Sequence, residues 1–227
     1  NNDAGFSIIT YTGDVSGTAV QETVGHGLGV TPEFVIIKDR TNTTNWRVYH
    51  KGLAAFGATA TANTLHLNTM SVAAGAGARV ADVNATTITL GGGTDDGGGV
   101  IGNDRQHVAY CWHSVEGFSK FGSYEGNNNA NGPFIYLGFK PAFIIIRSIE
   151  GGNREWMMMD NKRSTFNPID RFVQANSAGA ETTAYASPVD FLSNGFKLRC
   201  DEGNFNNSET HLYIAWAEMP FKYATAR

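Results

Sequence analysis

Residues 27–38 read Gly-Leu-Gly-Val-Thr-Pro-Glu-Phe-Val-Ile-Ile-Lys, and residues 137–147 read Leu-Gly-Phe-Lys-Pro-Ala-Phe-Ile-Ile-Ile-Arg. Each stretch has a Leu-Gly pair, then a proline, then a short apolar run typical of a central strand that is covered on both faces. The proline precedes the run, where its missing N–H does not interrupt strand pairing. The chain therefore contains the same strand-forming stretch twice, about 110 positions apart.

The repetition extends outward from this stretch on both sides. It includes a Gly-Phe-Ser triplet, a tryptophan that opens a strand pattern, and a closing strand that runs from histidine to tryptophan. These pairs lie at residues 5–7 and 117–119, at Trp46 and Trp156, and at 107–112 and 211–216. A period of this length indicates a duplicated domain, because the units of a solenoid have about 20–50 residues. We therefore predict two homologous lobes, residues 1–116 and 117–227, that pack together as one unit.

Strand patterns dominate both halves, and short helices are expected only at residues 51–56 and 168–174. About six strands recur in the same order in each half. In the closing strand of each half, we expect the face that carries Trp112 or Trp216 to be the core face. The fold class is therefore all-β, with two homologous antiparallel β-sandwich or jelly-roll-like lobes that arose by internal duplication.

The composition excludes several classes of partner. The 227 residues carry a net charge of −4, and binding to nucleic acid needs clustered Lys and Arg, so we predict no nucleic-acid partner. No apolar run approaches the roughly 18 residues of a membrane span, so we predict no membrane insertion. Cys111 and Cys200 cannot form a disulfide framework, and we expect two free thiols on strands. The chain begins without an initiator methionine, so we expect a fragment of a longer protein.

We predict neither a metal site nor a cofactor. The glycine-rich run at residues 91–99 contains Asp95 and Asp96, but adjacent aspartates in a single loose copy fit a solvated turn better than a calcium site. The six histidines show no spacing that zinc favours. His107 and His211 occupy equivalent strand positions in the two halves, which indicates packing rather than metal binding.

No catalytic residues are predicted. No serine lies in a Gly-x-Ser-x-Gly turn, and Cys111 has no activating neighbour in the sequence. Glu33, Asp39, Glu155 and Asp160 could supply a carboxylate pair for glycoside hydrolysis, but a chain with 21 acidic residues offers many such pairs. We therefore predict that the protein is not an enzyme.

The two repeated tryptophans have two interpretations. Trp46 and Trp156 each open a strand beside arginine, and an aromatic ring with polar neighbours can bind a sugar, whose apolar face stacks on the ring. The alternative, which we favour, is a core anchor that both copies kept after duplication.

Asparagine-rich loops in the second half are the other candidate for recognition. Loops on a rigid β scaffold are where binding usually occurs, and Asn side chains both donate and accept hydrogen bonds, which suits a neutral glycan. We expect these loops to be too polar for a core, although plain turn formation explains any single Asn equally well. Their members are Asn127, Asn128, Asn129, Asn131, Asn204, Phe205, Asn206 and Asn207. The predicted ligand-binding residues are Trp46, Tyr124, Asn128, Arg154, Trp156 and Phe205.

Five strings of sequence resemble a known family. They lie at residues 5–13, 24–32, 109–112, 116–124 and 220–224. On these strings, the chain resembles an uncharacterised domain of tailed-bacteriophage virion proteins, common in marine phages and their prophages, which often stands at the C-terminal end of a tail fibre or related tail protein. The resemblance covers nearly the whole chain and implies a phage structural or host-attachment protein that ends at or near Arg227. It brings no assigned catalytic or ligand residues.

From the resemblance and the polar loops we expect the distal domain of a phage tail fibre, located in the virion outside the cell. Its expected partners are a host cell-surface glycan or receptor and other tail proteins of the virion. Phage-fibre precedent implies a homotrimer, in which several weak sites combine into firm adhesion. Two alternatives remain open: a structural virion protein that acts as decoration or connector without a ligand, and an enzyme that degrades surface glycans.

Overall fold

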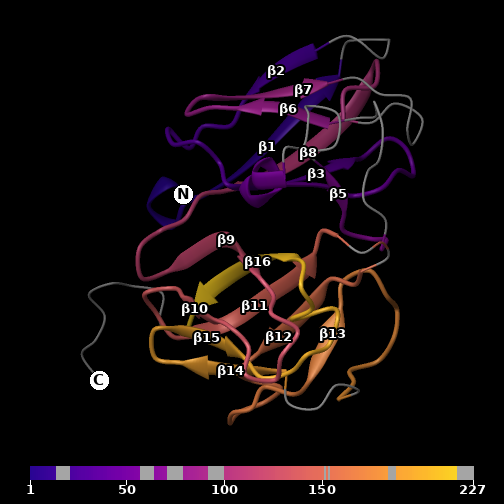
Figure 1. Cartoon of the computed structure of the whole chain (residues 1–227). Helices are drawn as coiled ribbons and strands as arrows, with labels where there is room; N and C mark the ends of the chain where they lie inside the picture. The colour runs from indigo at the N-terminus through magenta and orange to yellow at the C-terminus, as the bar shows by residue number, and fades with distance from the viewer. Residues whose placement is uncertain are drawn as a thin grey trace. The chain divides into compact units, whose positions relative to one another are not determined.

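The computed structural model describes residues 1–13, 21–56, 64–70, 79–91, 100–150, 152, 154–183 and 188–218. Within these ranges the chain forms antiparallel strands, two short 3-10 helices, η1 (Asn2–Ala4) and η2 (Lys51–Phe56), and no α-helix. The all-β prediction is therefore confirmed. The chain divides into two compact units, Asn1–His113 and Ser114–Arg227, a boundary three residues before the one we expected (Figure 1).

The first unit consists of two sheets. The larger sheet has the order β1-β8-β3-β4-β5, and the smaller sheet has the order β2-β7-β6. The strands of the larger sheet are β1 (Phe6–Gly13), β8 (Arg105–Trp112), β3 (Phe34–Asp39), β4 (Arg47–His50) and β5 (Leu65–His66). Those of the smaller sheet are β2 (Gln21–Gly25), β7 (Thr87–Gly91) and β6 (Arg79–Val83).

The second unit repeats this arrangement strand for strand. Its larger sheet has the order β9-β16-β11-β12-β13, and its smaller sheet has the order β10-β15-β14. The strands are β9 (Ser119–Glu125), β16 (Thr210–Ala217), β11 (Pro141–Ser148), β12 (Met157–Asp160), β13 (Phe172–Gln174), β10 (Phe134–Tyr136), β15 (Gly195–Leu198) and β14 (Val189–Leu192). In the described part of the chain each unit thus has eight strands rather than about six, and the common order agrees with internal duplication.

The core of each unit lies between its two sheets. In the first unit, Val35 and Ile37 of the larger sheet belong to the same buried cluster as Ile88 and Leu90 of the smaller sheet. In the second unit, the equivalent cluster joins the larger-sheet residues Ile144, Ile146, Met157 and Met159 to Ile135, Phe191, Phe196 and Leu198 of the smaller sheet. Burial of these apolar side chains stabilises the sandwich by roughly 25 cal/mol for each Å² removed from water.

The prediction for the core face of the closing strands is wrong for the sandwich core, although the predicted residues Leu212 and Ile214 are themselves buried. Ala109 and Cys111 of β8, and Tyr213 and Ala215 of β16, belong to the sandwich cores, so the residues that alternate with them, including both tryptophans, lie on the other face. These strands are apolar on both faces, and alternation alone cannot tell which face packs on the second sheet.

Each unit contains one stacked Tyr–His pair on neighbouring strands. The rings of Tyr11 and His107 are 4.9 Å apart, and those of Tyr124 and His211 are 5.0 Å apart. Both hydroxyls donate to backbone carbonyls, Tyr11 to Val100 at 2.7 Å and Tyr124 to Phe205 at 2.6 Å. Burial raises the pKa of both phenols. The repeated histidines are therefore packing residues.

The expectations about short helices and cysteines are confirmed in part. Residues 51–56 form a short helix as expected, but 168–174 do not, because Phe172 is buried and pairs with Met159 in a sheet. Both cysteines are free and buried, although Cys200 follows β15 instead of lying on it. The Asp95–Asp96 turn and the C-terminal string at 220–224 lie outside the described residues.

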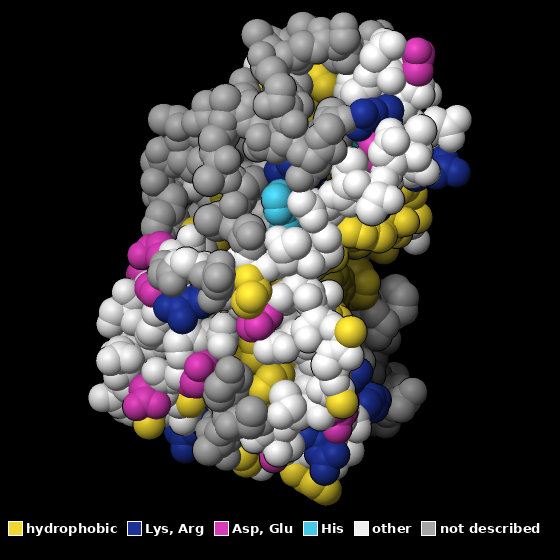
Figure 2. All heavy atoms as spheres, turned by 90° about the vertical axis from the view of Figure 1, so that its right-hand side faces the viewer, with side chains coloured by type: hydrophobic (Ala, Val, Ile, Leu, Met, Phe, Trp, Pro, Cys, Tyr) yellow, Lys and Arg dark blue, Asp and Glu magenta, His cyan; other side chains and the backbone are white. Residues whose placement is uncertain are grey.

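Three further properties concern possible partners. On the face shown in Figure 2, Lys and Arg side chains are scattered among acidic and uncharged ones and form no basic stripe. None of the described helices has the length and apolar character needed to cross a membrane. Among the described residues, no group of three or more His, Cys, Asp or Glu side chains is placed to hold a metal ion.

Candidate functional site

Trp46 and Trp156 occupy equivalent positions in the two units but differ in exposure. The backbone N–H of Trp46 donates to the side chain of Asn68 at 2.8 Å, and that of Trp156 donates to Asn176 at 2.9 Å. Trp46 is half-buried, whereas Trp156 is only 1% exposed and lies against the guanidinium of Arg147, 5.1 Å from the ring centroid. Burial lowers the pKa of Arg147 to about 10, so this side chain keeps its charge at neutral pH.

Arg154 is engaged within the protein. Its guanidinium makes two contacts with Glu209, from Nη2 to Oε1 at 2.7 Å and from Nε to Oε2 at 3.2 Å. Burial alone would raise the pKa of Glu209, but hydrogen bonds from Arg154, Ser148 and Asn207 outweigh it and lower the pKa. This bidentate pair ties the segment before β12 to the segment before β16, so Arg154 has a structural partner already.

Tyr124 and Phe205 lie in the core of the second unit, and Trp156 is buried against Arg147. Phe205 is fully buried and meets Phe172 edge to face, and its carbonyl accepts the hydroxyl proton of Tyr124. A ligand at the surface cannot reach these rings. We therefore correct the assignment of Tyr124, Trp156 and Phe205 as ligand-binding residues, because all three rings are buried.

The asparagine-rich loops are only partly at the surface. Asn206 is 0% exposed, and its amide nitrogen lies within hydrogen-bond distance of three oxygens: Asn127 Oδ1, Asn129 O and Cys200 O. Its side-chain oxygen accepts the N–H of Asn127 at 3.0 Å. The expectation that these residues are too polar for a core is wrong for Asn206, whose hydrogen bonds compensate its burial. Asn128 is exposed, with a positive φ of 50°.

The carboxylates considered for catalysis are dispersed. Glu33 pairs with Lys51 at 2.8 Å in the first unit, whereas Asp160 of the second unit pairs with Arg163 at 2.9 Å. Asp39 accepts two backbone N–H groups from the turn that follows β3, and Glu155 accepts a hydrogen bond from Asn176. Burial raises the pKa of the Cys111 thiol to about 12, which leaves it protonated at neutral pH.

Sequence reasoning missed two exposed aromatic side chains on β10, Phe134 and Tyr136. They are 44% and 60% exposed, whereas the alternating residues Ile135 and Leu137 are buried. Strand β10 is an edge strand of the smaller sheet of the second unit (Figure 1). Because side chains two positions apart share a face of a strand, the two rings lie side by side on the outer face of this sheet. We call Phe134 and Tyr136 the aromatic strip.

The strip is held by close contacts in the smaller sheet. Phe134 pairs with Lys197 and Tyr136 with Gly195 in the β10–β15 ladder. A Cβ at Gly195 would lie 3.1 Å from the Phe134 ring and 2.1 Å from the Ile135 carbonyl oxygen, so only glycine fits beneath the strip. The Asn127–Asn131 loop leads into β10, and Asn206 fixes this loop from below. The strip and the polar loop therefore form one rigid surface.

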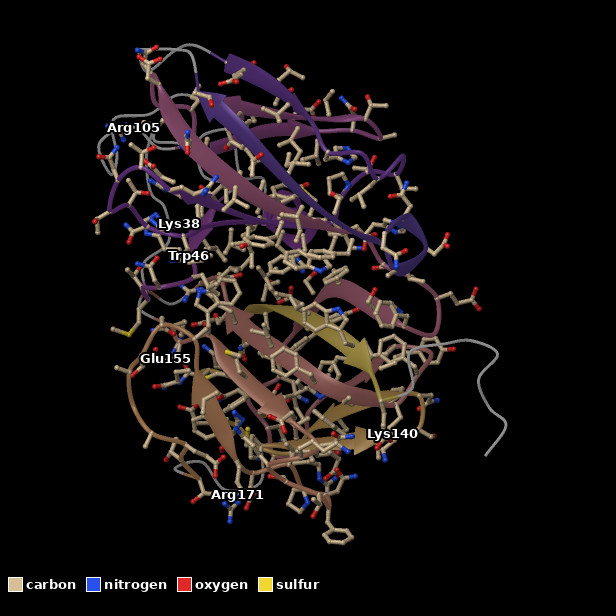
Figure 3. The ribbon with its side chains drawn as sticks, turned by 180° about the vertical axis from the view of Figure 1, so that it is seen from behind. Lys38, Trp46, Arg105, Lys140, Glu155 and Arg171 are labelled. Carbon is tan, nitrogen blue, oxygen red and sulfur yellow. The ribbon has the colours of Figure 1, made fainter. Side chains whose placement is uncertain are left out.

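The strip is separate from the cluster around Arg154. Lys140, four residues beyond the end of β10, and Glu155, next to Arg154, are seen at opposite sides of the second unit in Figure 3. The first unit has no equivalent strip. In the β2–β7 ladder Val24 is opposite the core residue Ile88, as Ile135 is opposite Phe196, which places Thr23 and Gly25 at the positions of Phe134 and Tyr136.

The described part of the first unit also contains a small pocket. Its volume is about 190 Å³, and it is lined by Thr10, Tyr11, Thr12, Arg40, Gln106 and His107. Its aromatic residues are the stacked Tyr–His pair, whose ring faces cover each other. The pocket therefore offers hydrogen-bond donors but no aromatic platform, and the strip is the stronger candidate.

The fold and this surface define a duplicated β-sandwich protein with an aromatic strip in one copy. Residues 1–220 match the model of the family described as "Domain of unknown function (DUF7483)", and the chain belongs to this family. No curated protein matches the chain. Among solved structures, the crystal structure of the STIV MCP is similar, with 8% sequence identity, a TM-score of 0.31, and coverage of 98% of this chain and 99% of that chain. A TM-score of this size supports no inference about fold or function.

Proposed function

We propose that this chain is the attachment domain of a bacteriophage tail fibre or related virion protein, and that it binds a polysaccharide on the host surface. The observation that carries the binding role is the aromatic strip, two adjacent exposed rings on a rigid edge strand. The phage setting is supported by the sequence strings that resemble phage virion domains. We assign ligand binding to Phe134 and Tyr136. Of the residues predicted from the sequence, only Asn128, in the adjoining loop, is kept.

Sugar recognition suits this surface physically. The apolar face of a sugar ring stacks on an aromatic ring, and its hydroxyls need donors and acceptors nearby. The exposed amide of Asn128 supplies such groups in the loop that enters β10, whereas the side chains of Asn127 and Asn129 form hydrogen bonds within the loop. Single exposed hydrophobic residues are common on protein surfaces, but two adjacent exposed aromatic rings on one strand are uncommon.

Attachment of this kind requires no chemical step, so the proposed domain is a binding module and not an enzyme. We propose that it acts as a homotrimer with the other tail proteins in the virion. Three linked copies raise the effective concentration of each weak site, so that avidity can exceed the single-site affinity by about 10²–10⁴.

The test is an array of purified bacterial surface polysaccharides, probed with the full 227-residue chain and with a Phe134→Ala/Tyr136→Ala variant. We expect selective binding by the wild-type chain and at least a tenfold loss in the double variant. Phe166→Ala is the matched control, since Phe166 is 82% exposed and lies on a loop bonded to β14, the other edge of the same sheet. Retained binding by the double variant, with loss in the control, would contradict the assignment.

The strip also supports a second function, a contact between subunits in a structural virion protein. Exposed aromatic residues are enriched at protein interfaces as well as at sugar sites. If the double variant changes the oligomeric state in sedimentation, and the wild-type chain binds no polysaccharide, the structural role replaces attachment.

A further inference from the structure

We infer that the polysaccharide bound by the aromatic strip is acidic and carries carboxylate groups on its sugars. This inference rests on the proposed function and adds the chemical class of the ligand. It follows from two lysines, Lys120 and Lys197, that flank the strip, and from what the first unit has at the same positions.

Lys120 lies at the Tyr136 end of the strip. Its ammonium donates to the carbonyl oxygen of Tyr136 at 2.8 Å and lies 5.2 Å from the centroid of the Tyr136 ring. The charge is therefore fixed over the Tyr136 ring. A sugar bound along the strip would bring its substituents close to this ammonium.

Lys197 lies at the Phe134 end. It is directly opposite Phe134 in the β10–β15 ladder, and its ammonium donates to the carbonyl oxygen of Gly132 at 2.7 Å. Neither Lys197 nor Lys120 forms an ion pair with a carboxylate in the part of the chain that the structure describes. An ammonium has three N–H donors, so each lysine can still bind an anionic oxygen.

The other charges near the strip do not cancel this pair. Asp190 is opposite Lys197 on β14, but it pairs with Arg199 at 3.3 Å. Lys140 pairs with Glu218 at 2.9 Å. Around the strip there is thus an excess of positive charge in a chain whose net charge is −4. This local excess is complementary to a carboxylate and would not be needed for a neutral glycan.

The first unit provides an internal comparison. Thr89 is opposite Thr23 in the β2–β7 ladder, as Lys197 is opposite Phe134, and the core residues Ile88 and Phe196 fix this correspondence. Ser7 precedes the stacked tyrosine of β1 by the same four positions by which Lys120 precedes the stacked tyrosine of β9. The first unit thus lacks both rings and both lysines at equivalent positions. The aromatic rings and the lysines are thus both present in the second unit and both absent from the equivalent positions of the first. This is expected if they form one site.

The test uses the full chain on an array that carries each bacterial surface polysaccharide in two forms, native and carboxyl-reduced. Reduction converts uronic acids to the matching neutral sugars and leaves the linkages unchanged. We expect binding to polymers that contain uronic acid and a loss of at least tenfold after reduction. Lys120→Met and Lys197→Met keep the apolar stems but remove the charge, and each should weaken binding about 3- to 10-fold.

Two variants serve as controls. Lys51→Met removes one charge from the first unit, where Lys51 pairs with Glu33, and should change binding by less than about twofold. Lys197→Arg keeps the charge and should retain binding. Thermal unfolding of each variant confirms that the fold is intact.

The outcomes separate this inference from the proposed function. Binding to native and reduced polymers alike, with Phe134 and Tyr136 still required, would overturn the acidic ligand but leave attachment in place. Equal weakening by Lys51→Met would also overturn it, because the effect would then come from overall charge. Binding to no polysaccharide in either form would overturn both.

Discussion

At the residue scale, the two equivalent tryptophans should contribute differently to the free energy of unfolding. Trp156→Ala should lower the free energy of unfolding by about 3–5 kcal/mol, because it leaves a cavity and removes the aromatic face that Arg147 lies against. Trp46→Ala should cost less, since Trp46 is half-buried. Chemical denaturation of the two variants measures the difference, and equal stabilities would contradict the core assignment of Trp156.

Asn206 is the buried residue on which the polar loop depends. Asn206→Ala should lower the free energy of unfolding by about 2–4 kcal/mol, because it leaves the N–H of Asn127 and the carbonyls of Asn129 and Cys200 without this partner. Asn131→Ala, at an exposed side chain of the same loop, should change stability by less than about 0.5 kcal/mol. If both variants unfold at the same denaturant concentration, Asn206 does not organise the loop.

Acid should destabilise the fold in two stages. Burial lowers the pKa of His211 below its ordinary value of 6.5, so below about pH 6.5 the unfolded chain takes up a proton that the folded chain does not, and stability falls. The pKa of Glu209 is also lowered, so the stability it provides is present above about pH 4.5 and is lost below it. Denaturation measured from pH 8 to pH 4 should show the first decline, and His211→Gln should flatten it. If stability declines as much in His211→Gln as in the wild-type chain, another titratable group causes the decline.

At the scale of elements, the sequence predicts strands better than it predicts their faces. The apolar runs after Pro32 and Pro141 are central strands, as expected, because length and composition together mark a strand covered on both sides. The core face of β8 could not be predicted, since Ala109 and Cys111 are as apolar as their neighbours on the other face. Small residues belong to the core there because the second sheet packs over them.

Most of the candidate site was also beyond prediction. Strand β10 has only three residues, so the alternation of exposed Phe134 and buried Ile135 is too short to be distinguished from a buried apolar run. The burial of Phe205 and Asn206 depends on contacts with distant parts of the chain. Local polarity therefore gave no indication of which loop residues are exposed.

Gly195 tests whether the β10–β15 ladder positions the strip. Gly195→Ala places a Cβ 2.1 Å from the Ile135 carbonyl oxygen, which must push β10 away from β15. We expect a loss of about 1–3 kcal/mol in the free energy of unfolding and weaker binding to polysaccharide. Gly25→Ala is the control, since the nearest atom to its Cβ is 3.9 Å away. Unchanged binding by a destabilised Gly195→Ala would show that the strip does not need this strand position.

At the scale of the whole molecule, the two units share one strand order but differ in surface. The first unit has glycine, serine and threonine where the second has two rings and two lysines, so we propose that the second unit alone binds the glycan. Duplication would then supply one binding unit and one unit whose surface is free for other contacts.

The proposed homotrimer gives a prediction at this scale. Sedimentation of the purified chain should give the mass of a trimer, and its apparent affinity for immobilised polysaccharide should exceed that for a short soluble oligosaccharide by about 10²-fold or more. A monomer with equal affinities for the two ligands would contradict multivalent attachment.

The most direct test of the aromatic strip is NMR of the chain labelled with ¹³C in its Phe and Tyr rings, during titration with a polysaccharide identified on the array. The signals of Phe134 and Tyr136, assigned by Phe134→Leu and Tyr136→Phe substitution, should shift or broaden, while that of the more exposed Phe166 stays unchanged. Perturbation of Phe166 or of rings in the first unit, with Phe134 and Tyr136 unmoved, would contradict the assignment of the site.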